Sequence, residues 1–477
     1  MTLPPGSLLF FTIIFTSLLT VSFSGCTSSE ESSNQISDGA GEIRLMTLNP
    51  GHFHAALVQK NELEGVSSRV HIYSPGGEDL ALHMQRINGF NQRNEDPTEW
   101  ESVIYEGHDY FKKMLEEQPG NVMIVAGNNR LKTDYILQAV DEGIHVLSDK
   151  PMAIDSGNWI RLRDAFRIAG ERGVLLYDIM TERYEVTSRI QRILAQNREL
   201  FGELQTGTPD EPAVVKQSVH HLYKMVAGAP LRRPQWYFDT LQQGEGIVDV
   251  TTHLVDLSLW GTFPDEAISY ESDVELIHAR RWPTMLTEEQ FGRITGASAF
   301  PDFLQEQLLA DGRLPYYSNG EIGFTLREHH VNVSVEWAYE APPGGNDTHY
   351  SLMRGTHSNL VIRQGADQNF RSTLFVEMAE GTDPVNLERA LEASVEELSG
   401  EFPGLSYLKN EYGFELIIPD EYYLGHEAHF GKVAEAYFGY LKEGRLPHWE
   451  IPNMITKYYI TTQARELAMR ADSASDL

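Results

Sequence analysis

The segment Gly143-Ile144-His145-Val146-Leu147-Ser148-Asp149-Lys150-Pro151 is the most informative part of the chain, because an apolar run of strand length ends abruptly in polar residues and a proline. Apolar runs of the same kind occupy residues 43–48, 70–73 and 122–126, with helix-like segments between them. Near-continuous apolar strands that alternate with helices predict a parallel sheet covered on both faces. Ligands of such sheets bind at the carboxyl ends of the strands, so we expect a site beside Lys150.

Length, composition and net charge narrow the classes of protein to which this chain can belong. The chain has 477 residues, of which 41% are hydrophobic, and this length predicts two or three globular domains. A formal net charge of -31 at pH 7 repels phosphate backbones and anionic lipid head groups. We therefore exclude nucleic acid as a partner.

The N-terminus resembles a bacterial lipoprotein signal. An apolar run over residues 8–21 is followed by Ser22-Phe23-Ser24-Gly25 and then by Cys26, the only cysteine in the chain. The run is shorter than the roughly 20 residues that span a membrane. We predict a signal peptide over residues 1–26, lipidation of Cys26, a flexible tether over 27–42, and anchoring at the cell envelope, facing either the periplasm or the surface. An uncleaved membrane anchor is the alternative.

A second polar pattern lies in residues 247–260, which are apolar almost all round and therefore predict a buried helix. Asp249, His253 and Asp256 fall at positions i, i+4 and i+7, which share one face of a helix. Burying such groups without partners is costly, so the stripe faces either a cavity or a hydrogen-bonded network. A structural Asp/His pair that caps a neighbouring loop is the alternative to a site.

Three segments together resemble the Gfo/Idh/MocA oxidoreductase family. Residues 143–151 are similar to a family signature, with Asp149 where the family carries Glu, and residues 126–129 occupy the place of the loop after the preceding strand. Residues 244–256 resemble the family's substrate-domain helix. The resemblance implies an α/β protein with a Rossmann-type nucleotide-binding domain over 43–178. It also implies an α+β domain with an open, mostly antiparallel sheet over 179–477.

The resemblance also implies a reaction, in which a nicotinamide accepts hydride from a carbinol carbon of a sugar or cyclitol. His253 would remove the hydroxyl proton, since the unperturbed pKa of histidine, about 6.5, lies near working pH. Asp249 would orient the imidazole, and Lys150 would hydrogen-bond the reacting oxygen. A salt bridge beside Pro151 is the alternative for Lys150. Tyr184 is expected to line the site.

The predicted cofactor turn departs from the usual Gly-x-Gly-x-x-Gly pattern, because its three positions are Asn49, Gly51 and His54. Backbone amides at the start of the following helix would still bind phosphate. The second strand ends in Tyr73-Ser74 without an acidic residue for the ribose, so this position does not distinguish NAD from NADP. We predict NAD or NADP as the cofactor, with a preference for tightly bound NAD. The expected cofactor contacts are Asn49, Gly51, His52, Phe53, His54, Ser74, Gly127, Asn128, Asn129 and Lys150.

Histidines and a basic pair complete the candidate site. His52 and His54 lie in the turn, and a zinc or iron site is an alternative for them. We instead interpret them as polar residues that line the cleft, with no metal, because His-x-His needs further ligands. The basic pair Arg232-Arg233 precedes aromatic residues and suits a carbohydrate or a carboxylated sugar, with a domain-packing loop as the alternative. The expected substrate contacts are Tyr184, His220, His221, Arg232, Arg233, Trp236 and Asp256.

The later part of the sequence predicts strands and helices that support the fold and contribute no candidate site residues. Strand-like segments at 321–326, 331–339, 350–353 and 360–362 alternate apolar and polar residues, as in an antiparallel sheet with one solvated face. Residues 426–441 and 455–471 predict terminal helices. The family resemblance implies a homo-oligomer formed through the outer face of this sheet.

Three functions remain open from the sequence. The first is a nicotinamide-dependent oxidoreductase acting on a hydroxyl of a sugar or glycoside. The second is a redox-neutral glycosidase or lyase in which tightly bound NAD forms a transient keto-sugar. The absence of twin arginines from the signal favours this second function, because nicotinamide is not freely supplied outside the cytoplasm. The third is a sugar-binding lipoprotein without catalysis.

Overall fold

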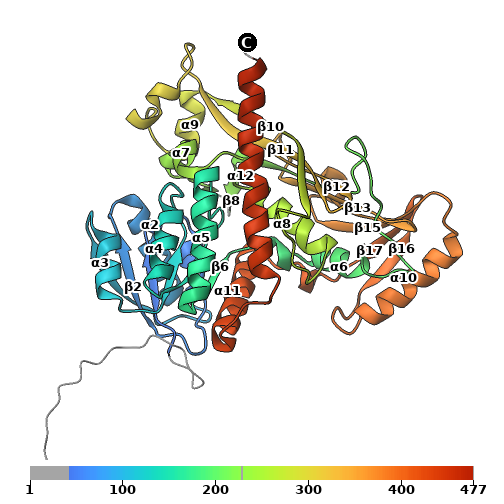
Figure 1. The fold of residues 1–477 in the computed structure, drawn as a ribbon, viewed down its shortest axis with the longest axis horizontal. Helices are drawn as coiled ribbons and strands as arrows, with labels where there is room; N and C mark the ends of the chain where they lie inside the picture. The colour runs from blue at the N-terminus through green and yellow to red at the C-terminus, as the bar shows by residue number, and fades with distance from the viewer. Residues whose placement is uncertain (1–41, 227–228, 476–477) are drawn as a thin grey trace, which may run out of the picture. The chain divides into compact units, whose positions relative to one another are not determined.

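The first part of the chain forms the predicted parallel sheet. The computed structural model describes residues 42–226 and 229–475. Six strands lie in the order β3-β2-β1-β4-β5-β6, and all adjacent pairs are parallel (Figure 1). The strands are β1 (Leu45–Leu48), β2 (Arg69–Ser74), β3 (Glu101–Glu106), β4 (Val122–Val125), β5 (His145–Ser148) and β6 (Leu176–Asp178).

Continuous apolar sequence explains the position of the inner strands. Every side chain of β1, β4 and β5 is buried, as expected for strands covered on both faces. β3 lies at the edge and exposes several side chains, so its polar composition did not predict a strand. The helices of this part are α1 (His54–Leu57), α2 (Glu78–Gln92), α3 (Tyr110–Glu117), α4 (Lys132–Asp141) and α5 (Ser156–Arg172).

Local sequence fixes the ends of α5, the helix that follows the Lys150 segment. The Asp155 side chain accepts a hydrogen bond from the Asn158 amide and so caps the first turn. The helix ends at Gly173, whose φ of 69° is the left-handed conformation that glycine adopts without strain. The chain then enters β6.

The second sheet is the predicted open, mostly antiparallel one. Its nine strands lie in the order β10-β11-β12-β7-β13-β14-β15-β17-β16, and β12 with β7 is the parallel pair. Buried and less buried residues alternate along β12, as in a sheet with one covered face. The strands are β7 (Val214–Tyr223), β10 (Val274–Leu286), β11 (Leu314–Leu326), β12 (His329–Glu340), β13 (Thr348–Arg354), β14 (Ser358–Gln364), β15 (Thr373–Met378), β16 (Ser406–Lys409) and β17 (Gly413–Ile417).

Helices join the two sheets. α8 (Thr251–Thr262) contacts β7 and β12, and α6 (Val186–Leu194) contacts β14 and β15, whereas the long α12 (Glu450–Ser475) contacts both α5 and β10 (Figure 1). α11 (His426–Glu443) contributes Phe430 and Tyr437 to the hydrophobic core of the first sheet. The remaining elements are η1 (Thr181–Tyr184), β8 (Met225–Val226), β9 (Ala229–Pro230), η2 (Gln235–Phe238), α7 (Thr240–Gln243), α9 (Glu288–Thr295), η3 (Asp302–Gln307), η4 (Ala366–Gln368), α10 (Pro384–Leu398) and η5 (Asp420–Tyr422).

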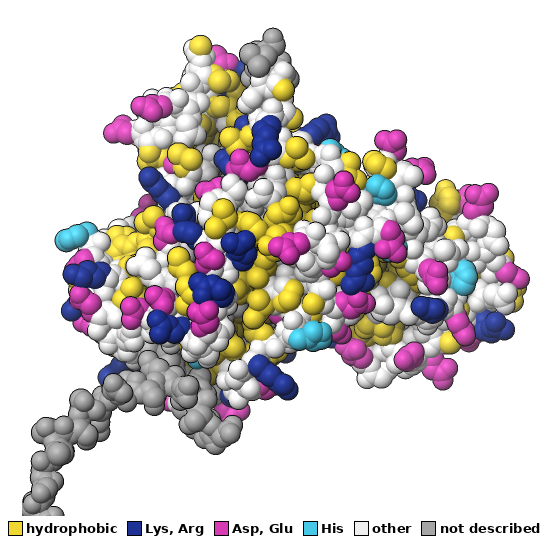
Figure 2. All heavy atoms as spheres, in the orientation of Figure 1, with side chains coloured by type: hydrophobic (Ala, Val, Ile, Leu, Met, Phe, Trp, Pro, Cys, Tyr) yellow, Lys and Arg dark blue, Asp and Glu magenta, His cyan; other side chains and the backbone are white. Residues whose placement is uncertain are grey.

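The described surface carries mixed charge. Figure 2 shows acidic side chains scattered among basic ones over the visible face, with apolar patches between them. In the part of the chain that the structure describes, no helix combines the length and the apolar composition needed to cross a membrane. Cys26 and the tether before residue 42 lie outside the described residues.

A buried ionic network connects β6, η1, α8 and α12. Arg183 binds Asp256 through two hydrogen bonds of 2.6 and 2.7 Å and also donates to Glu450. The Lys457 ammonium lies 2.7 Å from Asp178 and 2.8 Å from Asp256. All five side chains are buried, so each charge depends on its partners.

Asp256→Ala is therefore expected to lower the free energy of unfolding by about 3–5 kcal/mol, because two buried cations lose a shared counter-ion. Urea unfolding followed by circular dichroism measures the loss. Asp141→Ala is the control, since Asp141 pairs with Arg172 at the surface and such pairs contribute about 0–1 kcal/mol. Equal losses in the two variants would contradict the structural role of Asp256.

Candidate active site

A cavity of about 520 Å³ opens at the carboxyl ends of β1, β4 and β5. Phe53, Gly127 and Lys150 follow these three strands and line one side. The other side comes from the second part of the chain, including residues of β7 and α8, and from His426 at the start of α11. Its size is typical of small-molecule sites.

The residues predicted for the site separate into two groups. The cavity is lined by His52, Phe53, His54, Gly127, Asn129, Lys150, His220, Arg233, Trp236, Asp249 and His253. Among the described residues predicted for the site, the following do not line it: Asn49, Gly51, Ser74, Asn128, Tyr184, His221, Arg232 and Asp256. The structure thus brings Lys150 and His253 to one cavity.

Lys150 and Asp249 form the central polar contact. The Lys150 Nζ lies 2.5 Å from Asp249 Oδ1, and Gln243 donates to Asp249 Oδ2 at 3.0 Å. Burial alone would lower the pKa of Lys150, but the charges of Asp249 and Asp149 outweigh burial and raise it. Lys150 therefore stays an ammonium. Lys150 and Gln243 thus bind the two oxygens of Asp249, whereas His253 Nδ1 has no hydrogen-bond partner among the described residues, so Asp249 does not orient the imidazole through this atom as the sequence predicted.

His253 has a different protonation state from the one expected. Burial, and then the charge of Lys150, lower the pKa of His253 well below its usual value. The imidazole is neutral across the physiological range, and Nδ1 is buried without a hydrogen-bond partner among the described residues. The expectation that His253 has the unperturbed pKa of histidine, near working pH, is therefore wrong.

Asp256 is a structural residue, contrary to the prediction that it contacts substrate. It faces away from the cavity into the ionic network with Arg183 and Lys457. Burial would raise its pKa, but these two cations lower it, so Asp256 remains ionised. Helical spacing placed it on a polar face without identifying what that face contacts.

Glu182 lines the cavity in place of the predicted Tyr184, which packs beside the core of the first sheet. The two residues lie in the same one-turn helix η1 and point in different directions. Burial, followed by the nearby charge of Glu185, raises the pKa of Glu182 to about 7. A carboxyl group with this pKa exchanges protons near neutral pH.

The distal part of the cavity carries basic and aromatic groups. His220 and Lys224 both contact Asp347, which also accepts from His221 outside the cavity wall. The Arg233 guanidinium lies over the rings of Tyr237 and Trp337, 4.8 and 5.0 Å from their centres.

The neighbouring basic residue behaves differently. Arg232 reaches toward Gly296 and not toward the cavity. Only one member of the predicted basic pair is therefore placed to contact a ligand.

The predicted cofactor turn does not offer the usual diphosphate cradle. Asn49 adopts a left-handed φ of 45°, which asparagine tolerates better than most residues. The amides of Gly51 and His52 both donate to the Ala126 carbonyl, so neither N–H is free to bind a phosphate.

Two further features crowd this turn. A Cβ on Gly51 would lie 3.0 Å from Asp79 Oδ2 and 3.2 Å from the Trp236 ring, and Trp236 Nε1 donates to the same Asp79 oxygen. The following helix α1 has four residues. The residues present therefore fit a nicotinamide at the cavity end, beside Gly127, Asn129 and Lys150, but do not fit a diphosphate held by free amides at the turn.

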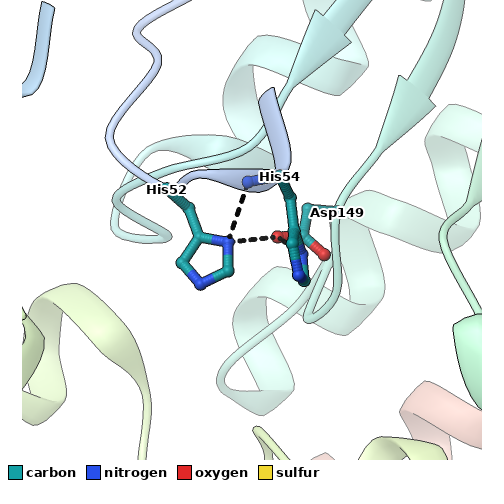
Figure 3. A group of neighbouring side chains, drawn as sticks. All are labelled: His52, His54 and Asp149. Atoms are coloured by element: carbon teal, nitrogen blue, oxygen red, sulfur yellow. Dashed lines mark hydrogen bonds and ion pairs between the residues drawn. The ribbon is translucent and has the colours of Figure 1, made fainter. Parts of the chain in front are cut away.

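Instead, side chains of the turn gather around Asp149 (Figure 3). The Nδ1 atoms of His54 and His52 lie 2.9 and 3.4 Å from Asp149 Oδ2. Burial lowers the pKa of His54 to about 4. Burial would raise the pKa of Asp149, but the two histidines outweigh it and hold this pKa well below the usual range. His426, which sequence reasoning missed because it lies far along the chain, places Nε2 2.9 Å from His54 Nε2.

Comparisons with known proteins agree with this architecture. Residues 49–177 match the family described as "Oxidoreductase family, NAD-binding Rossmann fold", and residues 190–469 match the "Putative oxidoreductase C terminal domain". A crystal structure of a "putative oxidoreductase" from Parabacteroides merdae is similar, with 51% identity, a TM-score of 0.89, and coverage of 91% of this chain and 98% of that one. No curated protein matches this chain by sequence.

Two more distant structures share the fold. A levoglucosan dehydrogenase in complex with NADH and levoglucosan has 13% identity and a TM-score of 0.57, with coverage of 90% of this chain and 98% of that one. A 3-ketoreductase from Actinomadura kijaniata in complex with NADP and TDP-benzene has 14% identity and a TM-score of 0.52, with the same coverage.

Glu182→Gln is expected to raise the melting temperature at pH 8 and to change it little at pH 4.5. The folded pKa of about 7 exceeds the usual value of 4.5, so wild-type stability falls as pH rises between these values, and the amide removes this loss. Thermal unfolding across a pH series measures the effect, with the exposed Glu203→Gln as control. A pH-independent difference would show that Glu182 does not titrate in this range.

Proposed function

Because the chain belongs to the Gfo/Idh/MocA family of NAD(P)-dependent oxidoreductases, we propose that it oxidises or reduces a hydroxyl-bearing carbon of a sugar or glycoside in this cavity. The observation that carries the proposal is the Lys150–Asp249 pair, which lies in the same cavity as His253. A buried ammonium fixed by a carboxylate is suited to hold a reacting oxygen.

Each side chain contributes a distinct step. Lys150 Nζ donates a hydrogen bond to the carbinol oxygen and stabilises negative charge that develops there, while Asp249 keeps the amine charged. The neutral His253 accepts a hydrogen bond from the same hydroxyl and takes its proton as the hydride leaves the carbon, and it returns the proton in the reverse reaction. A bound nicotinamide supplies the hydride acceptor or donor, and Gly127, Asn129 and Lys150 would hold it.

The rest of the wall suits a carbohydrate. Trp236 adds an aromatic side chain to the cavity wall, and His220, Arg233 and Asp347 offer donors and acceptors for hydroxyl groups. The levoglucosan dehydrogenase and the 3-ketoreductase that share the fold support this substrate class by analogy.

Location and assembly are also part of the proposal. We propose that lipidated Cys26 anchors the protein at the bacterial cell envelope and that the outer face of the second sheet forms a homo-oligomer. The domain limits 43–178 and 179–477 remain our proposal, with α11 and α12 returning to contact the first sheet.

A redox-neutral glycosidase or lyase is the second candidate. The observation that favours it is the N-terminal sequence, whose predicted export signal lacks twin arginines, because nicotinamide is not freely supplied outside the cytoplasm. Absorbance near 340 nm, together with mass detection of nicotinamide released on denaturation, distinguishes the two. Retained nicotinamide with no net change in its redox state during sugar cleavage supports this second candidate. Stoichiometric turnover of added NAD(P) with sugar supports the dehydrogenase.

Lys150→Ala and His253→Ala are each expected to lower turnover by roughly 100-fold or more, because each removes a group that contacts the reacting oxygen. Steady-state kinetics with a panel of sugars and glycosides measures the loss. Lys60→Ala is the matched control, since Lys60 forms a surface pair with Glu427. Near wild-type rates in both cavity variants, with the fold intact, would remove these residues from the mechanism.

A further inference from the structure

Three potential ligand atoms meet beside the turn after β1. His52 Nδ1, His54 Nδ1 and Asp149 Oδ2 all lie within 4.8 Å of one another (Figure 3). At metal–ligand bonds of ~2.1 Å, neighbouring ligand atoms lie roughly 3.0–3.4 Å apart. The distances from the two histidines to Asp149, 2.9 and 3.4 Å, are close to this range. From this geometry we infer that His52, His54 and Asp149 bind a divalent transition metal ion.

The fold explains why these residues meet. His52 and His54 follow β1, and Asp149 follows β5, and both strands pair with β4. Parallel strands end at one edge of the sheet, so residues that follow them gather there. The His-x-His spacing brings both imidazoles to the same carboxylate.

An unpaired polar atom gives a second reason for a ligand. Asp149 is 4% exposed, yet its Oδ1 has no hydrogen-bond partner among the described residues. An unpaired carboxylate oxygen that is buried costs free energy. A bound cation, or water coordinated to it, would satisfy this oxygen.

His426 supports the proposed metal site through a contact with His54, although His426 itself is not a ligand. If His54 binds the metal through Nδ1, its Nε2 carries the proton and donates to His426 Nε2 at 2.9 Å. Metal-bound histidines commonly donate their second ring N–H in this way, which fixes the tautomer. The contact therefore orients His54 for binding through Nδ1.

The ligand types narrow the choice of metal. Two imidazoles and one carboxylate suit Zn²⁺ or Fe²⁺, and three protein ligands leave coordination positions open. All three ligand residues line the cavity, so a substrate oxygen could reach those positions. Mg²⁺ prefers oxygen ligands and is disfavoured here.

This site explains the unusual turn independently of the proposed function. The positions that would hold a diphosphate carry imidazoles whose lone pairs favour a cation, whereas the amides are committed to Ala126. The inference requires neither nicotinamide nor sugar, so its test can fail while the oxidoreductase proposal stands, and the reverse.

Zinc binding to the purified full-length protein, freed of metal with a chelator, tests the inference by calorimetry. We expect His52→Ala, His54→Ala and Asp149→Asn each to weaken one Zn²⁺ site at least 100-fold. Substitution with Co²⁺ should produce visible absorption bands in wild type that each variant loses. The exposed His108→Ala is the matched control and should bind as wild type does.

The fold of each variant is checked by metal-free thermal unfolding. His54 and Asp149 are buried, so their variants can lose the fold, but the His52 side chain is 30% exposed and His52→Ala then decides the question. If wild type binds no Zn²⁺ at 100-fold molar excess, or if His52→Ala binds as tightly as His108→Ala, the metal site is refuted. Binding of Mg²⁺ as tight as that of Zn²⁺ would also overturn it.

Discussion

The ion pair between Lys150 and Asp249 determines the geometry of the cavity, because it joins the end of β5 to the turn before α8. Both side chains are largely buried, and neither charge is stable there without the other. Each therefore restricts where the opposite wall can lie. Gln243 restrains the second carboxylate oxygen, so the pair has little freedom to rotate. The position of His253, one turn further along, follows from this constraint.

A second buried network restrains the same helix from its other side. Asp256 binds Arg183 and Lys457, which belong to η1 and α12. α8 is thus held by Asp249 just before its start and by Asp256 about two turns later. Glu182 precedes Arg183 in η1, so the structural anchor also places the cavity carboxyl group. Structural and cavity-lining residues alternate along these short segments.

The sequence predicted the features that depend on local pattern. Continuous apolar runs predicted β1, β4 and β5, because burial on both faces requires them, whereas the exposed edge strand β3 carried no such pattern. Helical spacing identified Asp249, His253 and Asp256 as a polar stripe, but it could not show that α8 begins at Thr251 or that Asp256 turns toward α12. His426 could not be predicted either, since only tertiary packing brings α11 beside β1.

The turn after β1 shows how the side chains of a turn determine the kind of ligand that its position in the fold favours. Parallel strands deliver their following residues to one edge whatever those residues are. A glycine-rich turn presents amide N–H groups there, and these attract anions. In this chain the amides of Gly51 and His52 are turned inward to Ala126, and imidazole nitrogens and the Asp149 carboxylate face the cavity instead. Lone pairs and negative charge attract cations, so the same backbone position here has the opposite electrostatic preference.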